Sequence, residues 1–235
     1  MEHEAALIML VVMSVVSVGN AKRKNGDFNN FLLDFNTRIL YSKEVRRIKI
    51  NIFILDKDPI TAAQLQCDKH VVKMIVESAQ MLSTAHRMLD GELKRAPSKS
   101  GKTLSKHWTL PDNRESVLYK AVHMAHPCTV WSMINTGNYW WHYVHFTALC
   151  NEYTYRYGKV HATDTLLRNA LANYPKNIPT NWRTQFPLAM QSNPECMHPN
   201  DPVRSYREFY QTKQARFKMV WTNREVPKWF GCLTK

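Results

Sequence analysis

The fold of this chain is decided by one stretch, CDKHVVKMIVESAQML, which runs from Cys67 to Leu82. Its apolar residues recur at helical spacing, which predicts an amphipathic helix with one buried side. We expect that side to carry Val72, Ile75, Val76, Ala79 and Leu82.

Lys73 and Glu77 stand one helical turn apart and close to the apolar side of this helix. Side chains at this spacing can meet. An exposed pair would contribute only about 0.3–0.5 kcal/mol to stability. A partly buried glutamate would instead have a raised pKa and could move protons near neutral pH. The pair is therefore either an ordinary ion pair or an acid–base centre.

The composition indicates a packed, basic protein. The chain has 235 residues, 44% of them hydrophobic, and a formal net charge of +13. A positive balance of this size favours a polyanionic partner, most often nucleic acid or an anionic membrane surface. The cysteines are odd in number, widely spaced and without a CxxC pair, which argues against zinc knuckles and disulfides and favours free thiols in a reducing, intracellular compartment. They are Cys67, Cys128, Cys150, Cys196 and Cys232.

Residues 1–48 differ in character from the rest of the chain. The stretch from Ala5 to Val18 is almost continuously apolar, but its 14 or so residues fall short of the roughly 20 that span a bilayer. Its flank Glu2-His3-Glu4 lacks the positive charge of a signal peptide. Three interpretations stay open: a membrane or targeting segment, an upstream extension, or a packed helix. Membrane contact is expected only through this segment.

We expect residues 49–235 to form a single, mainly α domain with long irregular loops, preceded by a non-globular extension. Ile50–Leu55 is β-branched and predicts a strand or extended start, and Asp58-Pro59 predicts a helix N-terminus. The polar segments 90–114 and 174–202 predict loops. Further helices are expected over residues 114–126, 129–157 with an interruption at Gly137 and an end at Gly158, 163–173, and 201–221, with the tail 226–230 held by its aromatic residues.

Two histidine pairs, His123/His126 and His142/His145, have the i,i+3 spacing that permits metal binding by a helix face. Glu77 and Glu152 could complete such a site. Histidines among many aromatic residues more often form hydrogen bonds or contact phosphate. Most of the aromatic residues between 131 and 157 are expected in the core, although one or two could stack on an extruded base.

Several motifs together resemble a known family. They are the Asn51-Ile52-Phe53 start, the run Cys67-Asp68-Lys69-His70 leading to Lys73, Glu77 and Gln80-Met81-Leu82, then His126-Pro127 with Trp131, Ala148–Tyr153 ending at Arg156, and Val226–Phe230. Residues 50–230 resemble a largely uncharacterised family of tailed phages and other large DNA viruses. More distantly, the chain is similar to the pyrimidine-dimer DNA glycosylases, also called endonuclease V.

The glycosylase resemblance implies an all-α fold, an extruded nucleotide, attack of an amine on the sugar C1′, a Schiff base and strand cleavage by β-elimination. Glu77 matches the family's acid–base glutamate, and His70 matches a family histidine. The family's nucleophile is its N-terminal α-amine, with a pKa near 8. Here about fifty residues precede the matching position. The resemblance therefore leaves open removal of these residues, substitution by Lys73 or Lys69, or a different chemistry.

The leading hypothesis is a DNA glycosylase/lyase-like enzyme of viral type that acts on duplex, damaged or modified DNA without metal or cofactor. Glu77, Lys73 and His70 are the expected catalytic residues. The alternatives are a non-enzymatic nucleic-acid-binding protein and a metal-dependent hydrolase or oxygenase that uses the histidines and Glu77. The expected nucleic-acid contacts are Lys69, Arg87, Arg156, Lys159, His161 and Arg207.

Overall fold

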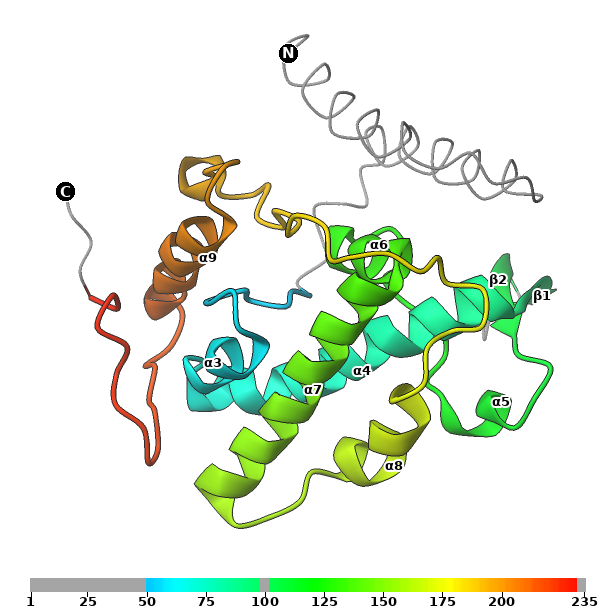
Figure 1. Ribbon diagram of the computed structural model, residues 1–235, viewed down its shortest axis with the longest axis horizontal. Helices are drawn as coiled ribbons and strands as arrows, with labels where there is room; N and C mark the ends of the chain where they lie inside the picture. Colours follow the sequence, from blue (N-terminus) through cyan, green and yellow to red (C-terminus); the bar gives the residue numbers. More distant parts are fainter. Residues whose placement is uncertain (1–49, 98–101, 232–235) are drawn as a thin grey trace, which may run out of the picture. The chain divides into compact units, whose positions relative to one another are not determined.

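A computed structural model describes residues 50–97 and 102–231, so the expectations for residues 1–48 lie outside it. The described residues are mainly helical, as expected, with one two-stranded sheet (Figure 1). In chain order the elements are α3 (Pro59–Gln64), α4 (Asp68–Asp90), β1 (Glu92–Pro97), β2 (Leu104–Thr109), α5 (Arg114–Val117), α6 (Pro127–Ile134), α7 (Thr136–Tyr157), α8 (Ala162–Leu171), a 3-10 turn (Pro194–Cys196), α9 (Pro202–Gln211) and a second 3-10 turn (Thr212–Ala215).

Helix α4 is the scaffold against which α6, α7 and α8 pack, and α7 also packs on α3. Its buried face includes Val71, Met74, Ile75, Ala79 and Leu82. The observed buried face is rotated by part of a turn from the predicted one, as the exposure of Val72 (37%) shows. The difference arises because His70 and Ser78 are also buried. Both are polar, so the pattern of apolar residues places them on the solvent side of the helix.

The two long helices are delimited by local chemistry. Asn135 takes an extended conformation (φ −162°, ψ 170°) between α6 and α7, and its side-chain oxygen accepts the Asn138 N–H at 2.9 Å. The expected interruption is therefore confirmed, two residues earlier than Gly137. Gly158 ends α7 in the left-handed conformation with φ 64°, which glycine adopts without steric cost.

Three expected elements differ from the structure. Residues 90–114, predicted as a loop, contain the antiparallel hairpin β1–β2. The helix expected over 114–126 ends at Val117, because the carbonyls of Leu118 and Tyr119 accept N–H groups of the Arg87 side chain. The helix expected to continue to Trp221 ends at Gln211 and then tightens into a 3-10 turn.

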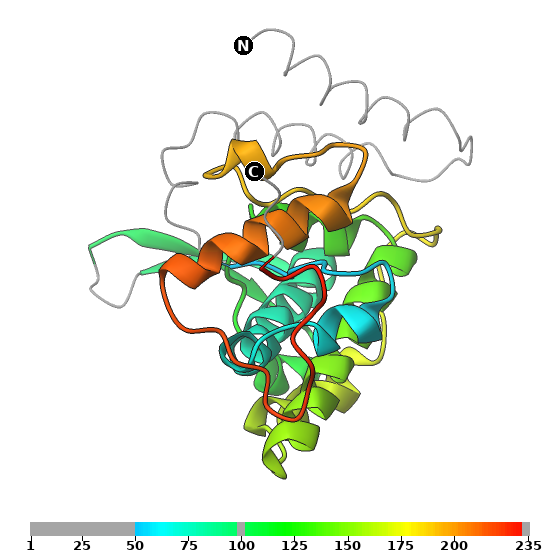
Figure 2. The ribbon, with the colours of Figure 1, turned by 90° about the vertical axis from the view of Figure 1, so that its left-hand side faces the viewer.

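Residues 50–55 form no strand, and they are almost fully buried. Phe53 has φ 54°, a rarely adopted conformation for a residue with a side chain. Its ring packs against His70 at 4.6 Å and Tyr210 at 5.0 Å between ring centroids, and this packing holds the strained backbone in place. Arg207 of α9 donates to the Leu55 carbonyl at 2.9 Å, so α9 lies beside this segment (Figure 2).

A buried ion network joins the ends of α4 and α7 to the C-terminal segment. Arg156 near the end of α7 donates to Glu152 at 2.7 Å and to Asp68 at the start of α4 at 2.8 Å. Arg224 and Thr222 of the C-terminal segment bind the same two carboxylates. The tail is also held by aromatic residues, as expected: Trp221 and Phe230 have ring centroids 4.7 Å apart, and Trp229 packs on Tyr210.

Within residues 50–97 and 102–231, no helix is both long enough and apolar enough to cross a membrane.

Gly137 approaches the segment 181–183 so closely that an added Cβ would overlap the backbone nitrogen of Arg183. We expect Gly137→Ala to destabilise the protein by about 2–3 kcal/mol in urea denaturation, because two backbone segments must separate. Gly158→Ala is the control: nothing lies near its Cβ, so only the left-handed backbone costs energy, about 1–2 kcal/mol. Equal losses of unfolding free energy in the two variants would show that the close approach at Gly137 is not rigid.

Candidate active site

Glu77 lies between a side-chain amine and a backbone amide. One carboxylate oxygen is 2.8 Å from Lys73 Nζ. The other accepts the backbone N–H of Asn51 at 3.2 Å. The Glu77 side chain is only 12% exposed, whereas the Lys73 side chain is 49% exposed. The pair therefore reaches from the interior to solvent and is not an ordinary surface ion pair.

Asn51 is held firmly in this position. Its side-chain nitrogen donates to the Ala189 carbonyl at 3.0 Å, and its side-chain oxygen accepts the Ile52 N–H at 2.8 Å. The thiol of Cys128 lies 3.9 Å from the same oxygen. The backbone nitrogen of Asn51 is thus fixed beside the carboxylate by two distant parts of the chain, at Cys128 and Ala189, and by the neighbouring Ile52.

Burial raises the pKa of Glu77, while the hydrogen bonds from Lys73 and the Asn51 N–H act in the opposite direction. A carboxyl group with a raised pKa can accept and release a proton closer to neutral pH than a solvated one. The geometry also has a structural interpretation, in which Glu77 satisfies a buried backbone N–H.

His70 is buried, and its Nδ1 lies 2.7 Å from the Tyr210 hydroxyl and 3.6 Å from the Cys67 sulfur. Burial, helped by the charges of Lys73 and Lys213, lowers the pKa of His70 to about 3. The imidazole is therefore neutral at physiological pH. In this position it orients the start of α4 and carries no charge toward a phosphate.

Lys213 is the unusual cation near this site. The residue is only 8% exposed, and its Nζ lies 3.3 Å from the centroid of the Phe209 ring. Burial, together with the charges of Arg216 and Lys73, lowers the pKa of Lys213 to about 8. No described carboxylate forms an ion pair with it.

Two of the expected phosphate contacts are enclosed in the interior. The Arg87 side chain is fully buried, and its five N–H groups are bound by the carbonyls of Trp108, Glu115, Leu118 and Tyr119 and by the Glu115 carboxylate. The Arg156 side chain is equally buried in its ion network. Both guanidinium groups are enclosed by protein and have no exposed surface for DNA, and we assign both a structural role.

The other expected contacts lie nearer the surface and on different elements. Lys69 is exposed, with its Nζ 4.7 Å from the Phe217 ring centroid, and Lys159 is exposed just after α7. His161 caps α8 by accepting the Thr163 N–H at 3.1 Å. Arg207 is partly exposed and lies 3.3 Å from Asp56. The structure therefore joins only Lys73 and Glu77 directly.

Among the described residues, no three histidine, cysteine, aspartate or glutamate side chains converge on a point that could hold a metal ion. His142 binds Ser132 at 2.7 Å, whereas His145 binds the Pro59 carbonyl at 2.9 Å. His126 caps α6. The histidine pairs thus turn to separate structural tasks, and the geometry gives no support to the metal-dependent alternative.

Sequence reasoning overlooked Asn51 as a site residue and did not predict the burial of Lys213. Asn51 had a usable signal, because it is the only polar residue in the apolar run Ile50–Leu55. Lys213 had none, since its burial depends on how the chain turns after α9.

Comparisons with protein-family models, with curated proteins and with solved structures gave no match. The resemblance to the viral family and to the pyrimidine-dimer glycosylases therefore stays a prediction.

Replacing Glu77 by glutamine should not destabilise the protein at pH 7. The folded-state pKa of Glu77 is raised, so its charge costs stability above that pKa and the cost disappears as pH falls below the unfolded value. In urea denaturation at pH 7, we expect the free energy of unfolding of Glu77→Gln to equal or exceed that of the wild type. The difference between the two proteins should be smaller at pH 4.

The matched control is Glu152→Gln, also a buried glutamate, which should lose about 3 kcal/mol because Arg156 and Arg224 keep their charges without a partner. A similarly large loss for Glu77→Gln would assign Glu77 a purely structural role.

Lys213→Met should stabilise the protein by about 1–2 kcal/mol at pH 7, since a buried ammonium is replaced by an apolar chain of similar length. The pKa of Lys213 falls to about 8 in the folded state from an ordinary 10.5. The wild type therefore gains stability as pH rises from 8 towards 10, and the difference between the proteins should shrink over that range. A variant less stable than the wild type would reveal a partner for the ammonium.

Proposed function

We propose that this protein is a DNA-processing enzyme of viral type that acts inside the infected cell as a glycosylase or lyase on a damaged or modified base in duplex DNA. The observation that carries the proposal is the position of Glu77, a largely buried carboxylate with an amine at 2.8 Å and a backbone nitrogen at 3.2 Å. The resemblance of the Asp68–Glu77 helix to the pyrimidine-dimer glycosylases supports the same chemistry.

In the proposed glycosylase step, a neutral amine attacks C1′ of the target sugar, the bond from C1′ to the base breaks, and the base takes up a proton and leaves. At an abasic site the open-chain aldehyde loses water and forms an imine with the amine. Glu77 then removes a proton from C2′, the bond from C3′ to the 3′ phosphate oxygen breaks, and the phosphate leaves. Water finally hydrolyses the imine and releases the amine.

Lys73 is the first candidate for the amine. In water its ammonium and the Glu77 carboxylate are stable as a charged pair. DNA bound over the half-exposed Lys73 would exclude water from the pair, and Glu77 is placed to accept a proton from this amine. The proton has only the 2.8 Å between the two groups to cross.

The second candidate is an α-amine at Asn51. It would exist only in a chain that begins at Asn51. Its nitrogen already lies within hydrogen-bond distance of Glu77, which is where a nucleophile activated by this carboxylate must stand.

The decisive experiment is borohydride trapping on duplex DNA with one abasic site, followed by mass mapping of the modified peptide. We expect a covalent adduct that Glu77→Gln reduces at least about 100-fold, the size of a lost general acid–base group. The adduct should map to Lys73, or to the α-amine of molecules that begin at Asn51. Lys73→Gln separates these two sites, and Lys57→Gln, an exposed lysine with the same charge change, is the control.

Absence of an adduct with every protein would exclude the imine mechanism. If DNA affinity persisted and Glu77→Gln left it unchanged or improved it, the non-enzymatic binding protein would be the better interpretation.

A further inference from the structure

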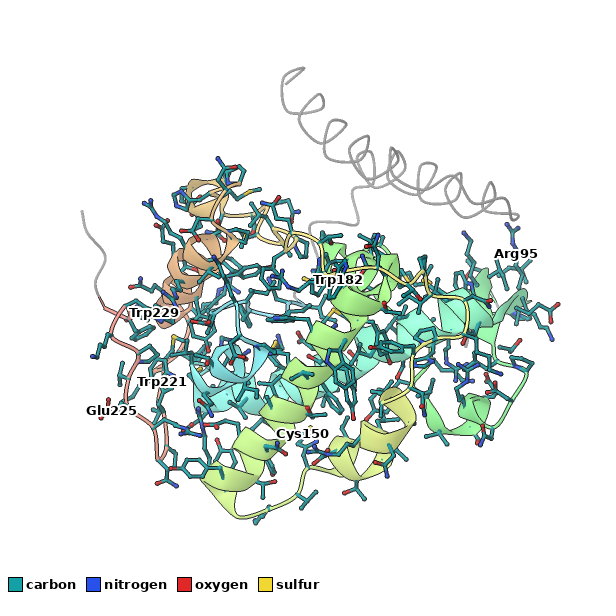
Figure 3. All side chains as sticks on the ribbon, in the orientation of Figure 1. Arg95, Cys150, Trp182, Trp221, Glu225 and Trp229 are labelled. Carbon is teal, nitrogen blue, oxygen red and sulfur yellow. The ribbon has the colours of Figure 1, made fainter. Side chains whose placement is uncertain are left out.

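The hairpin β1–β2 carries a concentration of positive charge that the site around Glu77 does not use. Figure 2 shows the hairpin projecting beyond the helices, and Figure 3 places Arg95 at its outer end, pointing away from them. Between Glu92 and Thr109, the described residues include four lysines and arginines and one acidic residue. The cations are Lys94, Arg95, Lys102 and Lys106.

The pairing of the strands places like charges together. Arg95 lies directly opposite Lys106, and Lys94 lies opposite His107. Like charges at directly opposed positions destabilise a hairpin. Lys94 has a carboxylate at 3.3 Å in Glu92, but no described carboxylate pairs with Arg95 or Lys106. An anion bound between these two side chains would relieve the repulsion.

A groove runs along the hairpin where it meets the segment after α5. Its volume is about 370 Å³, and its lining includes Lys94, Lys106, His107, Trp108 and Lys120. The Lys120 side chain is 71% exposed, and its Nζ lies 2.6 Å from the Glu115 carboxylate. Lysine side chains, which bind phosphate, thus line this hollow.

We infer that this hairpin binds the phosphate backbone of duplex DNA, away from the reacting nucleotide. The choice of DNA rests on the proposed function, while the positive groove itself does not. A duplex suits the groove better than a single strand, because single-strand sites offer a series of stacking aromatic rings and this groove has one tryptophan.

The spacing along α4 sets the position of the contact. Glu77 and Asp90, the last residue of α4, are separated by 13 helical residues, about 20 Å at a rise of about 1.5 Å per residue. That distance equals about six base pairs at about 3.4 Å each. The hairpin should therefore contact phosphates roughly six base pairs to one side of the target.

The test compares full-length wild type with Arg95→Ser/Lys106→Ser in a DNA-binding titration at several salt concentrations. Both residues are exposed and unpaired with carboxylates, so the variant should fold normally. We expect about 10- to 100-fold weaker affinity at 0.1 M salt and a salt slope lower by about 2, the effect of two lost phosphate contacts. The control, Lys57→Ser/Lys218→Ser, removes the same charge from two other exposed positions and should have a smaller effect.

The position of the hairpin contact on the DNA is measured with a series of duplexes in which the abasic site lies at increasing distance from one end. Wild-type affinity should fall when that flank is trimmed below about six base pairs, and the hairpin variant should not respond to the trimming. Equal losses for both double variants, or no response of the wild type to either flank, would overturn the inference. So would a hairpin variant that binds DNA normally but loses affinity for anionic lipid vesicles.

The test of the hairpin and the test of the proposed function can fail independently of each other. Salt-dependent binding through the hairpin requires no imine, and an imine at Glu77 requires no hairpin.

Discussion

The described fold depends on the buried guanidinium of Arg156. It joins Asp68 at the start of α4, Glu152 one turn earlier on α7, and the carbonyl of Gln64 at the end of α3. Asp68 and Glu152 then hold the C-terminal segment through Thr222 and Arg224. Charges removed from water are costly unless every partner is present, so this arrangement permits little variation in where α4 and α7 begin and end. The register of α4, and hence the position of Glu77, is fixed from this end.

The surroundings of Glu77 combine rigidity with unfavourable electrostatics. The carboxylate is buried, His70 is kept neutral, and Lys213 retains a proton only weakly, with its pKa near 8. A protein selected for stability alone gains little from two buried ionisable groups with shifted pKa values. Such clusters are more frequent at sites that transfer protons or form covalent bonds. This comparison favours chemistry at Glu77 over a purely structural role.

The sequence predicted the helical class, the cap at Asp58, the end of α7 at Gly158 and the meeting of Lys73 with Glu77, because these depend on residues within a few positions of each other. It did not predict the hairpin β1–β2, whose polar strands lack the apolar alternation by which strands are recognised. It also could not predict that Arg87 and Arg156 are interior. An arginine looks like a surface cation until tertiary structure supplies carbonyls and carboxylates for its N–H groups. Asn51 illustrates the same limit, since its partner Glu77 is 26 residues away.

Arg87 recognises main-chain atoms almost exclusively. Four of its five hydrogen bonds go to carbonyls between Trp108 and Tyr119, and every amino acid carries a carbonyl. The side chains of that connection are therefore free to diverge during evolution without loss of the turn, provided that Arg87 and Glu115 are kept. The base of the hairpin can thus change its surface chemistry, while the geometry that carries it is inherited unchanged.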